Sequence, residues 1–335
     1  MSVALSRRQV TLLSGGLLLL VVVVAASLAL GARPIPLGQV WGSVVDHDPT
    51  SRDQLVVRSL RLPRTIIGLA VGGALGLAGT IVQGITRNPL ADPGVLGVNA
   101  GAAVGVVVAI NVFGIASPLG WMAFAMTGAA AASLLVYLLG ARGRSSSPVT
   151  LALAGAAVAA MLVAITSAIL LLDQRTLDQF RFWVVGSLVG GEVDVLTAVG
   201  PFLLTGTALA LLLGPVLNAL GLGDDVATAL GHRVRTGRAV GLVAIVLLVG
   251  SAVSIAGPIG FVGLVVPHVA RGLGGPDHRW LLLASLVFAP LLLLGADVVG
   301  RLVVRPAELQ VGVVTALVGA PFFVALVRRR RLVET

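Results

Sequence analysis

The chain has 335 residues, of which 57% are hydrophobic and only 11% are charged, and its net charge is +9. A soluble domain would carry about 25% charged residues, so this chain has too little polar surface for a water-soluble globule and lipid must act as its solvent. All 23 basic residues are arginines and there is no cysteine, which excludes a P-loop lysine, a Schiff-base lysine, disulfides and cysteine-ligated metals.

Ten apolar segments predict an all-α polytopic membrane protein with about ten transmembrane helices in one domain, 1–335. The first has about 20 apolar residues, longer than the roughly 7–15 of a signal-peptide core, so it is interpreted as a retained span. The eighth is short. The polar stretch Gly31–Arg61 is predicted to be an external loop. The predicted spans are Val10–Leu30, Leu62–Ile85, Val95–Phe113, Leu119–Gly140, Val149–Leu172, Val195–Leu213, Ala239–Ala256, Ile259–Leu273, Trp280–Val299 and Gln310–Val327.

The distribution of arginines predicts the orientation. With the N-terminus inside, cytoplasmic segments hold 14 of the 23 arginines but only five of the 14 acids, and the outer segments hold nine of each. The inner arginines include Arg142, Arg144 and the tail Arg328–Arg331. This bias follows the positive-inside rule and predicts that both termini are cytoplasmic. It also explains the net charge without nucleic acid, which we do not expect as a partner.

Two segments predict a weak inverted repeat. Offset by 178 residues, Ile67–Pro89 and Ile245–Pro267 share nine of 23 positions. They lie in the second and seventh spans, so they cross the membrane in opposite directions. Inverted repeats are a common plan of transporters.

Four polar stretches at the ends of spans carry a family resemblance. They are Arg61–Gly105, which contains RNPLADP; FRFWVVGSLVGGEVD at 180–194; the segment with GDDVATALG at 223–231; and GPIGFVGLVVPHVAR at 257–271, followed by DHR at 277–279 and ADVVGR at 296–301. Together they resemble the FecCD-type permeases, the membrane subunits of ABC importers for ferric siderophores, haem and cobalamin. The resemblance runs from about Val10 to Val327.

The resemblance implies a set of partners and a place in the cell. It implies a second permease subunit, identical or paralogous, a binding protein outside and two ATPase subunits inside, in the cytoplasmic membrane of a bacterium. ATP would then bind the partner chains, and this chain would have no catalytic residue, cofactor or metal of its own. The LGVNAGA version of the third-span motif favours a ferric siderophore as cargo, with haem or cobalamin as alternatives.

The cytoplasmic segment Gly221–Arg238 is predicted to couple the chain to an ATPase. By the resemblance, its Asp225, Ala227 and Gly231 match the general importer loop, and Asp224 lies beside them. We expect Ala227 and Leu230 to form an apolar helical patch that Gly231 ends, suited to a groove in a soluble partner. The alternative is a passive solvated loop.

A rigid cytoplasmic turn is predicted between the second and third spans. Pro89 and Pro93 prevent a continuous helix, and Asn88 and Asp92 are residue types that cap helix ends. We interpret this turn as structural, with a role in gating as the alternative.

The PHxxR sequence closes the eighth span. The resemblance implies that Pro267, His268 and Arg271 lie near the ATPase contact, and the alternative is a core histidine. A metal site is disfavoured, because no second ligand lies three or four residues away.

Arginines gather at the predicted outer ends of the second and ninth spans. The resemblance implies that Arg61, Arg64 and Arg301 meet acidic residues on the binding protein, and proximity adds Arg58 and Arg305. Guanidinium–carboxylate pairs align two surfaces reversibly. The alternative is that these arginines balance acids of the chain itself.

Three side chains near the outer face leave their roles open. Asp297 is either a functional membrane acid or the partner of Arg301 four residues later. Phe182 and Trp183 are either an interfacial anchor or part of the substrate mouth.

Two other classes of function compete with the importer. An ion-coupled secondary transporter would usually need acids in mid-span, and the spans contain few of them. An intramembrane enzyme would need a catalytic motif such as HExxH or GxSxG, and the chain has neither.

Overall fold

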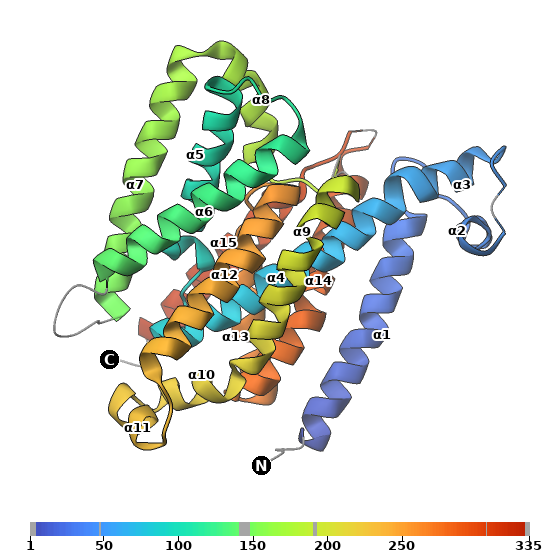
Figure 1. The fold of residues 1–335 in the computed structure, drawn as a ribbon. Helices are drawn as coiled ribbons and strands as arrows, with labels where there is room; N and C mark the ends of the chain where they lie inside the picture. The colour runs from blue at the N-terminus through green and yellow to red at the C-terminus, as the bar shows by residue number, and fades with distance from the viewer. Residues whose placement is uncertain (1–4, 47, 141–147, 190–192, 306, 332–335) are drawn as a thin grey trace.

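The computed structural model describes residues 5–46, 48–140, 148–189, 193–305 and 307–331, and its regular elements there are all helical. Figure 1 shows a bundle of long helices with short helices at both ends. Within the described residues, seven helices are long and apolar enough to cross a membrane, and three shorter apolar ones accompany them. One helix corresponds to each predicted span, so the predicted fold class is confirmed. These helices are α1 (Arg7–Ala29), α4 (Leu62–Thr86), α5 (Val98–Asn111), α6 (Pro118–Gly140), α7 (Pro148–Leu172), α9 (Val193–Leu212), α12 (Val234–Ala256), α13 (Val262–Gly274), α14 (His278–Val303) and α15 (Val311–Arg331).

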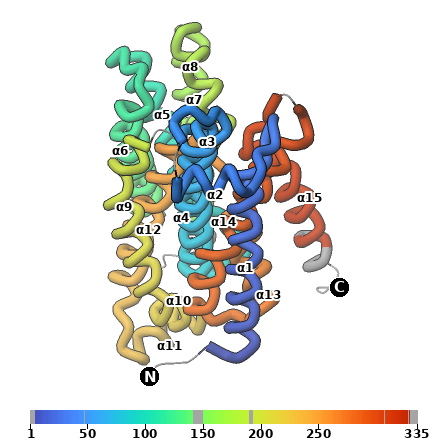
Figure 2. Tube along the Cα trace, turned by 90° about the vertical axis from the view of Figure 1, so that its right-hand side faces the viewer, coloured from blue at the N-terminus to red at the C-terminus, as the bar shows by residue number. Residues whose placement is uncertain are grey.

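The bundle has two different ends. One end, here called the α11 end, carries the start of α1 together with α10 (Gly214–Gly221) and α11 (Asp224–Ala229). The other, the α8 end, carries α2 (Leu37–Val45), α3 (Arg52–Val56) and α8 (Gln174–Val184). The α11 end lies at the bottom of Figures 1 and 2 and the α8 end at the top.

The prediction that Gly31–Arg61 is a loop was wrong. The stretch forms α2, α3 and a π-helical turn, η1 (Val57–Arg61), which joins α3 to α4 without a break. Pro63 explains the π turn, because its ring would crowd the carbonyl four residues earlier in a regular α-helix. The turn is closed by the Leu62 N–H bonding to the Val57 carbonyl instead.

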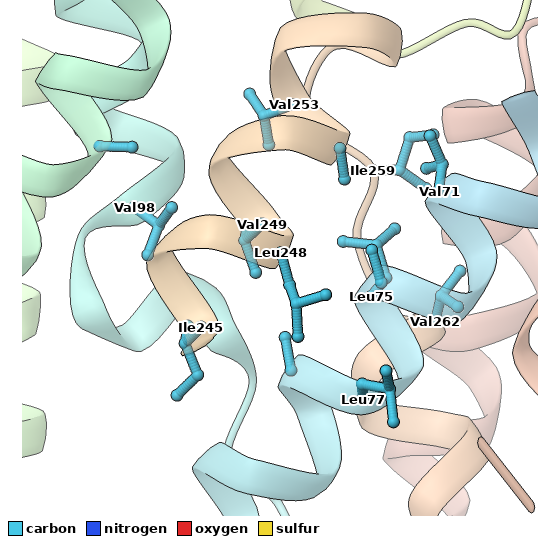
Figure 3. Close-up of a cluster of buried hydrophobic side chains, with 14 of the residues drawn as sticks. Val71, Leu75, Leu77, Val98, Ile245, Leu248, Val249, Val253, Ile259 and Val262 are labelled. Carbon is cyan, nitrogen blue, oxygen red and sulfur yellow. The ribbon is translucent and has the colours of Figure 1, made fainter. Parts of the chain in front are cut away.

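Helix α4 is the centre of the bundle. Glycines on α4 let neighbouring backbones approach closely, as at Gly72 against Pro290 and Gly79 against Gly263. A Cβ atom at Gly72 would lie 2.6 Å from the Pro290 Cα atom, so no larger residue fits there without movement. Figure 3 shows the core where α4, α12 and α13 meet, and its labelled side chains include Val71, Leu75, Leu77, Ile245, Leu248, Val249 and Val262.

Helices α4 and α12 run in opposite directions along the bundle, as the inverted repeat predicts for its two copies. The structural match between the two copies ends at a glycine that both contain. α12 ends at Ala256 and Gly257 breaks the helix with a φ of 68°, whereas α4 continues through the matching Gly79 to Thr86. The two copies of the repeat therefore match in structure over the helix before this glycine and differ after it.

Candidate coupling and docking sites

The predicted coupling helix exists and ends where the sequence indicates. Gly231 adopts a φ of 84°, a left-handed conformation that suits glycine. The N–H groups of His232 and Gly231 donate to the carbonyls of Ala227 and Thr228 at 3.0 and 2.9 Å. This is the Schellman pattern of a glycine-terminated helix.

The apolar patch of the coupling segment has a different composition from the predicted one. Ala227 is fully buried beneath α11, so it supports the helix and offers no surface to a partner. Val226 and Leu230, four residues apart on α11, are 45% and 61% exposed, and Leu222, which ends α10 just before α11, is 65% exposed. We call these three residues the α11 patch.

Asp224 ties α11 to the ends of two long helices. Its carboxylate binds Arg87, at the end of α4, and Arg238, in the first turns of α12, whose Nη2 lies 3.0 Å from Oδ1. Asp225 is exposed beside it. Asp224 therefore connects α11 to both α4 and α12.

The turn after α4 interrupts the helix as predicted, but of its two predicted caps only Asp92 caps a helix. Arg87 ends α4 in a left-handed conformation with a φ of 51°. The Asn88 Oδ1 atom accepts the Leu90 N–H at 3.0 Å, so Asn88 closes a tight turn. The Asp92 Oδ1 atom accepts the Gly94 N–H at 2.8 Å and caps a short 3-10 helix, η2 (Pro93–Leu96), which Pro93 begins.

Pro89 lies between Asn88 and Leu90 in this turn, outside both flanking helices, as its missing N–H favours. Burial raises the pKa of the Asp92 carboxyl above its usual value, although the bond from the Gly94 N–H acts in the other direction.

The PHxxR residues lie on α13 and face helices of this chain. The Arg271 Nη1 atom donates to the Gln83 Oε1 atom of α4 at 3.3 Å. The His268 ring packs edge-on against Phe322 of α15, with centroids 5.9 Å apart. Pro267 lies inside α13 and is buried. Among the described residues, no group of three or more His, Cys, Asp or Glu side chains is arranged to hold a metal ion.

At the α8 end, Asp297 is the centre of a buried ion-pair network. It is fully buried, and its Oδ2 atom lies 2.8 Å from the Arg301 Nη2 atom, which confirms the i,i+4 pair. Arg64 reaches across from α4 and places its Nη2 and Nε atoms 2.7 and 3.1 Å from the same carboxylate. The Arg64 Nη1 atom also binds Glu308 at 2.6 Å.

Two of the arginines satisfy the end of α1. A helix leaves its last four carbonyls without partners inside the helix. Here Leu30 and Ile35 donate their N–H groups to the carbonyls of Ala26 and Ala29. The two remaining carbonyls, of Ser27 and Leu28, accept bonds from Arg301 and Arg61 at 2.9 and 2.8 Å.

These bonds bury two of the arginines that were predicted to dock the binding protein. Arg61 and Arg301 are 7% and 2% exposed, so the expectation that their guanidinium groups face a partner does not hold in this structure. The Arg64 side chain is 11% exposed and binds the partly exposed Glu308. Arg58 and Arg305 are exposed.

The aromatic residues of α8 divide between surface and core. Phe182 is 63% exposed and the Arg181 guanidinium lies over its ring, whereas Trp183 packs against Phe180 with centroids 5.5 Å apart. Asp173 caps the start of α8, and its pKa is lowered by its bond to the Thr176 hydroxyl. Arg142, Arg144 and residues 190–192 lie outside the described residues, as do the side chains of 329–331.

The fold and its two polar ends define a multi-pass helical membrane permease. The model of the FecCD transport family matches residues 18–329, and the chain belongs to that family. It is 48% identical over 330 residues to the ferric enterobactin transport system permease protein FepD of Escherichia coli, covering 98% of each chain. It is 40% identical over 278 residues to the hemin transport system permease protein HmuU of Yersinia pestis, covering 82% of this chain and 83% of the relative.

A solved structure has the same fold. It is described as an inward-facing conformation of a metal-chelate type ABC transporter, and it is 31% identical to this chain with a TM-score of 0.83. The similarity covers 95% of this chain and 99% of the other.

Proposed function

We propose that this chain is a permease subunit of a bacterial ABC importer that passes a ferric siderophore into the cytoplasm. The similarity to the enterobactin permease over nearly the whole chain supports this cargo, and the hemin relative keeps haem as the nearest alternative. The chain itself would perform no covalent chemistry. It would alternate between a conformation open to the outside and one open to the cytoplasm. A ligand or partner can drive this change only by binding one conformation more tightly than the other.

The observation that carries the coupling role is the construction of α11. An exposed apolar patch stands on a helix that is closed by a glycine turn and tied through Asp224 to α4 and α12. In this proposal the α11 patch sits in a groove of an ATPase subunit and transmits its movement to those helices. Two such ATPases would serve a pair of permeases, either identical or paralogous.

The α11 end would then face the cytoplasm. Arg7 and Arg8 begin α1, Arg87 ends α4, and Arg233 and Arg235 lie at the start of α12. These helix ends are all at the α11 end, in agreement with the positive-inside rule. His268 and Arg271 on α13 would lie next to the ATPase contact. Arg271 would move together with α4 through its bond to Gln83.

The α8 end would receive the binding protein. Arg58 and Arg305 are exposed and would meet carboxylates of that partner directly. Arg64 would contribute at the rim where Glu308 holds it. Arg61 and Arg301 would contribute indirectly, by fixing the end of α1. Direct contact with the binding protein would require their guanidinium groups to release the α1 carbonyls.

The experiment is transport into proteoliposomes that contain this chain, its second permease and the partner ATPase. Siderophore-loaded binding protein and ATP are supplied, and uptake of radioactive iron is measured. We expect uptake to stop when the catalytic glutamate of the ATPase is replaced. Uptake that continues and follows a proton or sodium gradient would overturn the proposal in favour of a secondary transporter. Haem replacing the ferric siderophore as the accepted cargo would overturn the cargo assignment alone.

A further inference from the structure

Helix α2 carries an apolar face that the described chain leaves uncovered. Leu37, Trp41, Val44 and Val45 are between 61% and 70% exposed. Their spacing of four, seven and eight residues places all of them on one side of the helix. The neighbouring side carries the buried Val40. We call the four exposed residues the α2 face.

The depth of α2 is fixed by its connection to α1. Helix α1 has 23 residues and is therefore about 35 Å long, slightly more than the roughly 30 Å of a bilayer's hydrocarbon core. The Ile35 N–H donates to the Ala29 carbonyl at 2.9 Å and holds the chain beside the end of α1, two residues before α2 begins. Figures 1 and 2 both show α2 beside the upper part of α1, and Figure 1 shows it projecting sideways from the bundle. When α1 spans the bilayer, α2 begins level with one edge of the hydrocarbon core.

The polar side of α2 is turned toward α3, and Gln39 on that side is exposed. Gln39 pairs with Gln54 of α3 at 3.5 Å, and the Gln54 Oε1 atom accepts the Asp48 N–H at 2.8 Å. The inner side of α2 packs through Val40 into a small core with Ile35. The large apolar side chains that α2 leaves exposed in the described chain all lie on the α2 face.

The surface beside α2 on α1 indicates which occupant fits. Leu18, Val21 and Val22 of α1 are 69%, 64% and 56% exposed along the membrane-spanning length. The α2 face adds four exposed apolar side chains near the end of this same helix. Tryptophan is enriched at that depth, because its ring is apolar and its N–H is polar.

We propose that α2 is an interfacial helix whose Leu37, Trp41, Val44 and Val45 side chains insert among lipid acyl chains at the α8 end. An amphipathic helix binds membranes in this way, parallel to the surface. The inserted helix fixes the height of α3 through Gln54, and with it the start of the long helix that carries Arg58 and Arg64. This inference depends on membrane insertion alone and not on the cargo or the ATPase.

Single cysteines test the proposal, because the chain has none of its own. The full-length variants Val44→Cys and Gln39→Cys, on different sides of α2, are spin-labelled and placed in nanodiscs of phosphatidylethanolamine and phosphatidylglycerol. Leu18→Cys provides the membrane reference and Arg33→Cys, whose side chain is 78% exposed, the aqueous one. Collision of each label with oxygen and with a water-soluble nickel chelate is measured by electron paramagnetic resonance.

We expect the label at 44 to behave like the label at 18, with oxygen favoured over nickel, and the label at 39 to behave like the label at 33. A label at 44 as accessible to nickel as the label at 33 would overturn the proposal, because the α2 face would then be in water. A label at 44 shielded from both reagents would also overturn it and would indicate a protein partner. Unchanged thermal unfolding of each variant ensures that the comparison concerns the native fold.

Discussion

The Arg64 guanidinium of α4 and the Asp297 carboxylate of α14 form a forked ion pair with separations of 2.7 and 3.1 Å, although 233 residues separate them in the chain. Asp297 is fully buried and also binds Arg301 at 2.8 Å. One carboxylate thus holds two arginines, and one of these satisfies the end of α1. The α8 end is a connected structure in which three long helices meet at a single charge.

Replacing Asp297 with asparagine should destabilise the fold strongly. Removing one partner of a buried ion pair costs about 3–5 kcal/mol, because the remaining charge is buried without compensation. The Asp297→Asn variant should therefore unfold at a clearly lower temperature in detergent. Glu308→Gln is the matched control, because Glu308 is partly exposed and exposed pairs contribute only about 0–1 kcal/mol. Equal losses in the two variants would contradict the central position of Asp297.

The exposed arginines should control association with the binding protein. Reversing the charge in Arg58→Glu together with Arg305→Glu should weaken binding, mainly by slowing association, and should reduce its dependence on salt. Binding kinetics in nanodiscs at two salt concentrations measure this. Arg235→Glu, at the α11 end, is the control and should bind normally. If the double variant binds like the control, these arginines take no part in docking.

The turn after α11 should accept only residues that tolerate a positive φ. Asparagine adopts the left-handed conformation at little cost, whereas a β-branched residue does not. Gly231→Asn should keep most of the ATP-driven uptake, and Gly231→Val should lose it at equal membrane expression. The opposite ranking would show that the left-handed turn at 231 is not required.

The close approach of α4 and α13 should not tolerate a side chain. A Cβ atom at Gly79 would overlap the backbone at Gly263, whereas one at Gly295 of α14 would meet nothing within 4 Å. Overpacking of this kind costs typically about 1–3 kcal/mol. Gly79→Ala should lower the unfolding temperature and Gly295→Ala should leave it unchanged. A normal unfolding temperature for Gly79→Ala would contradict the close packing.

The positions of the spans could be predicted because they depend on local composition. Runs of apolar residues and the arginines beside them indicate each of the ten segments, and Gly231 marks the end of α11 through its own conformational freedom. The helical arm before α4 was missed, although Leu37, Trp41 and Val44 follow helical spacing. Its helices have only five to nine residues each and are too short to register as membrane spans.

The contacts that decide exposure could not be predicted, because they join distant parts of the chain. Arg61 and Arg301 are charged residues at the ends of spans, a pattern typical of surface positions. They are buried because the last carbonyls of α1 need donors, and only the fold brings those groups together. The burial of Ala227 could not be predicted either, because it depends on how α11 packs on α10 and α12.

The most direct test of the account concerns the α11 patch. Leu230→Asp places a charge on the patch, whereas Thr228→Asp places the same charge on another exposed side of α11. Both variants are assembled with the second permease and the ATPase, and ATP-driven uptake of the ferric siderophore is measured in proteoliposomes. The account predicts that Leu230→Asp abolishes uptake and lowers retention of the ATPase, while Thr228→Asp transports normally. Full uptake by Leu230→Asp would show that the patch does not receive the ATPase and would contradict the proposed coupling.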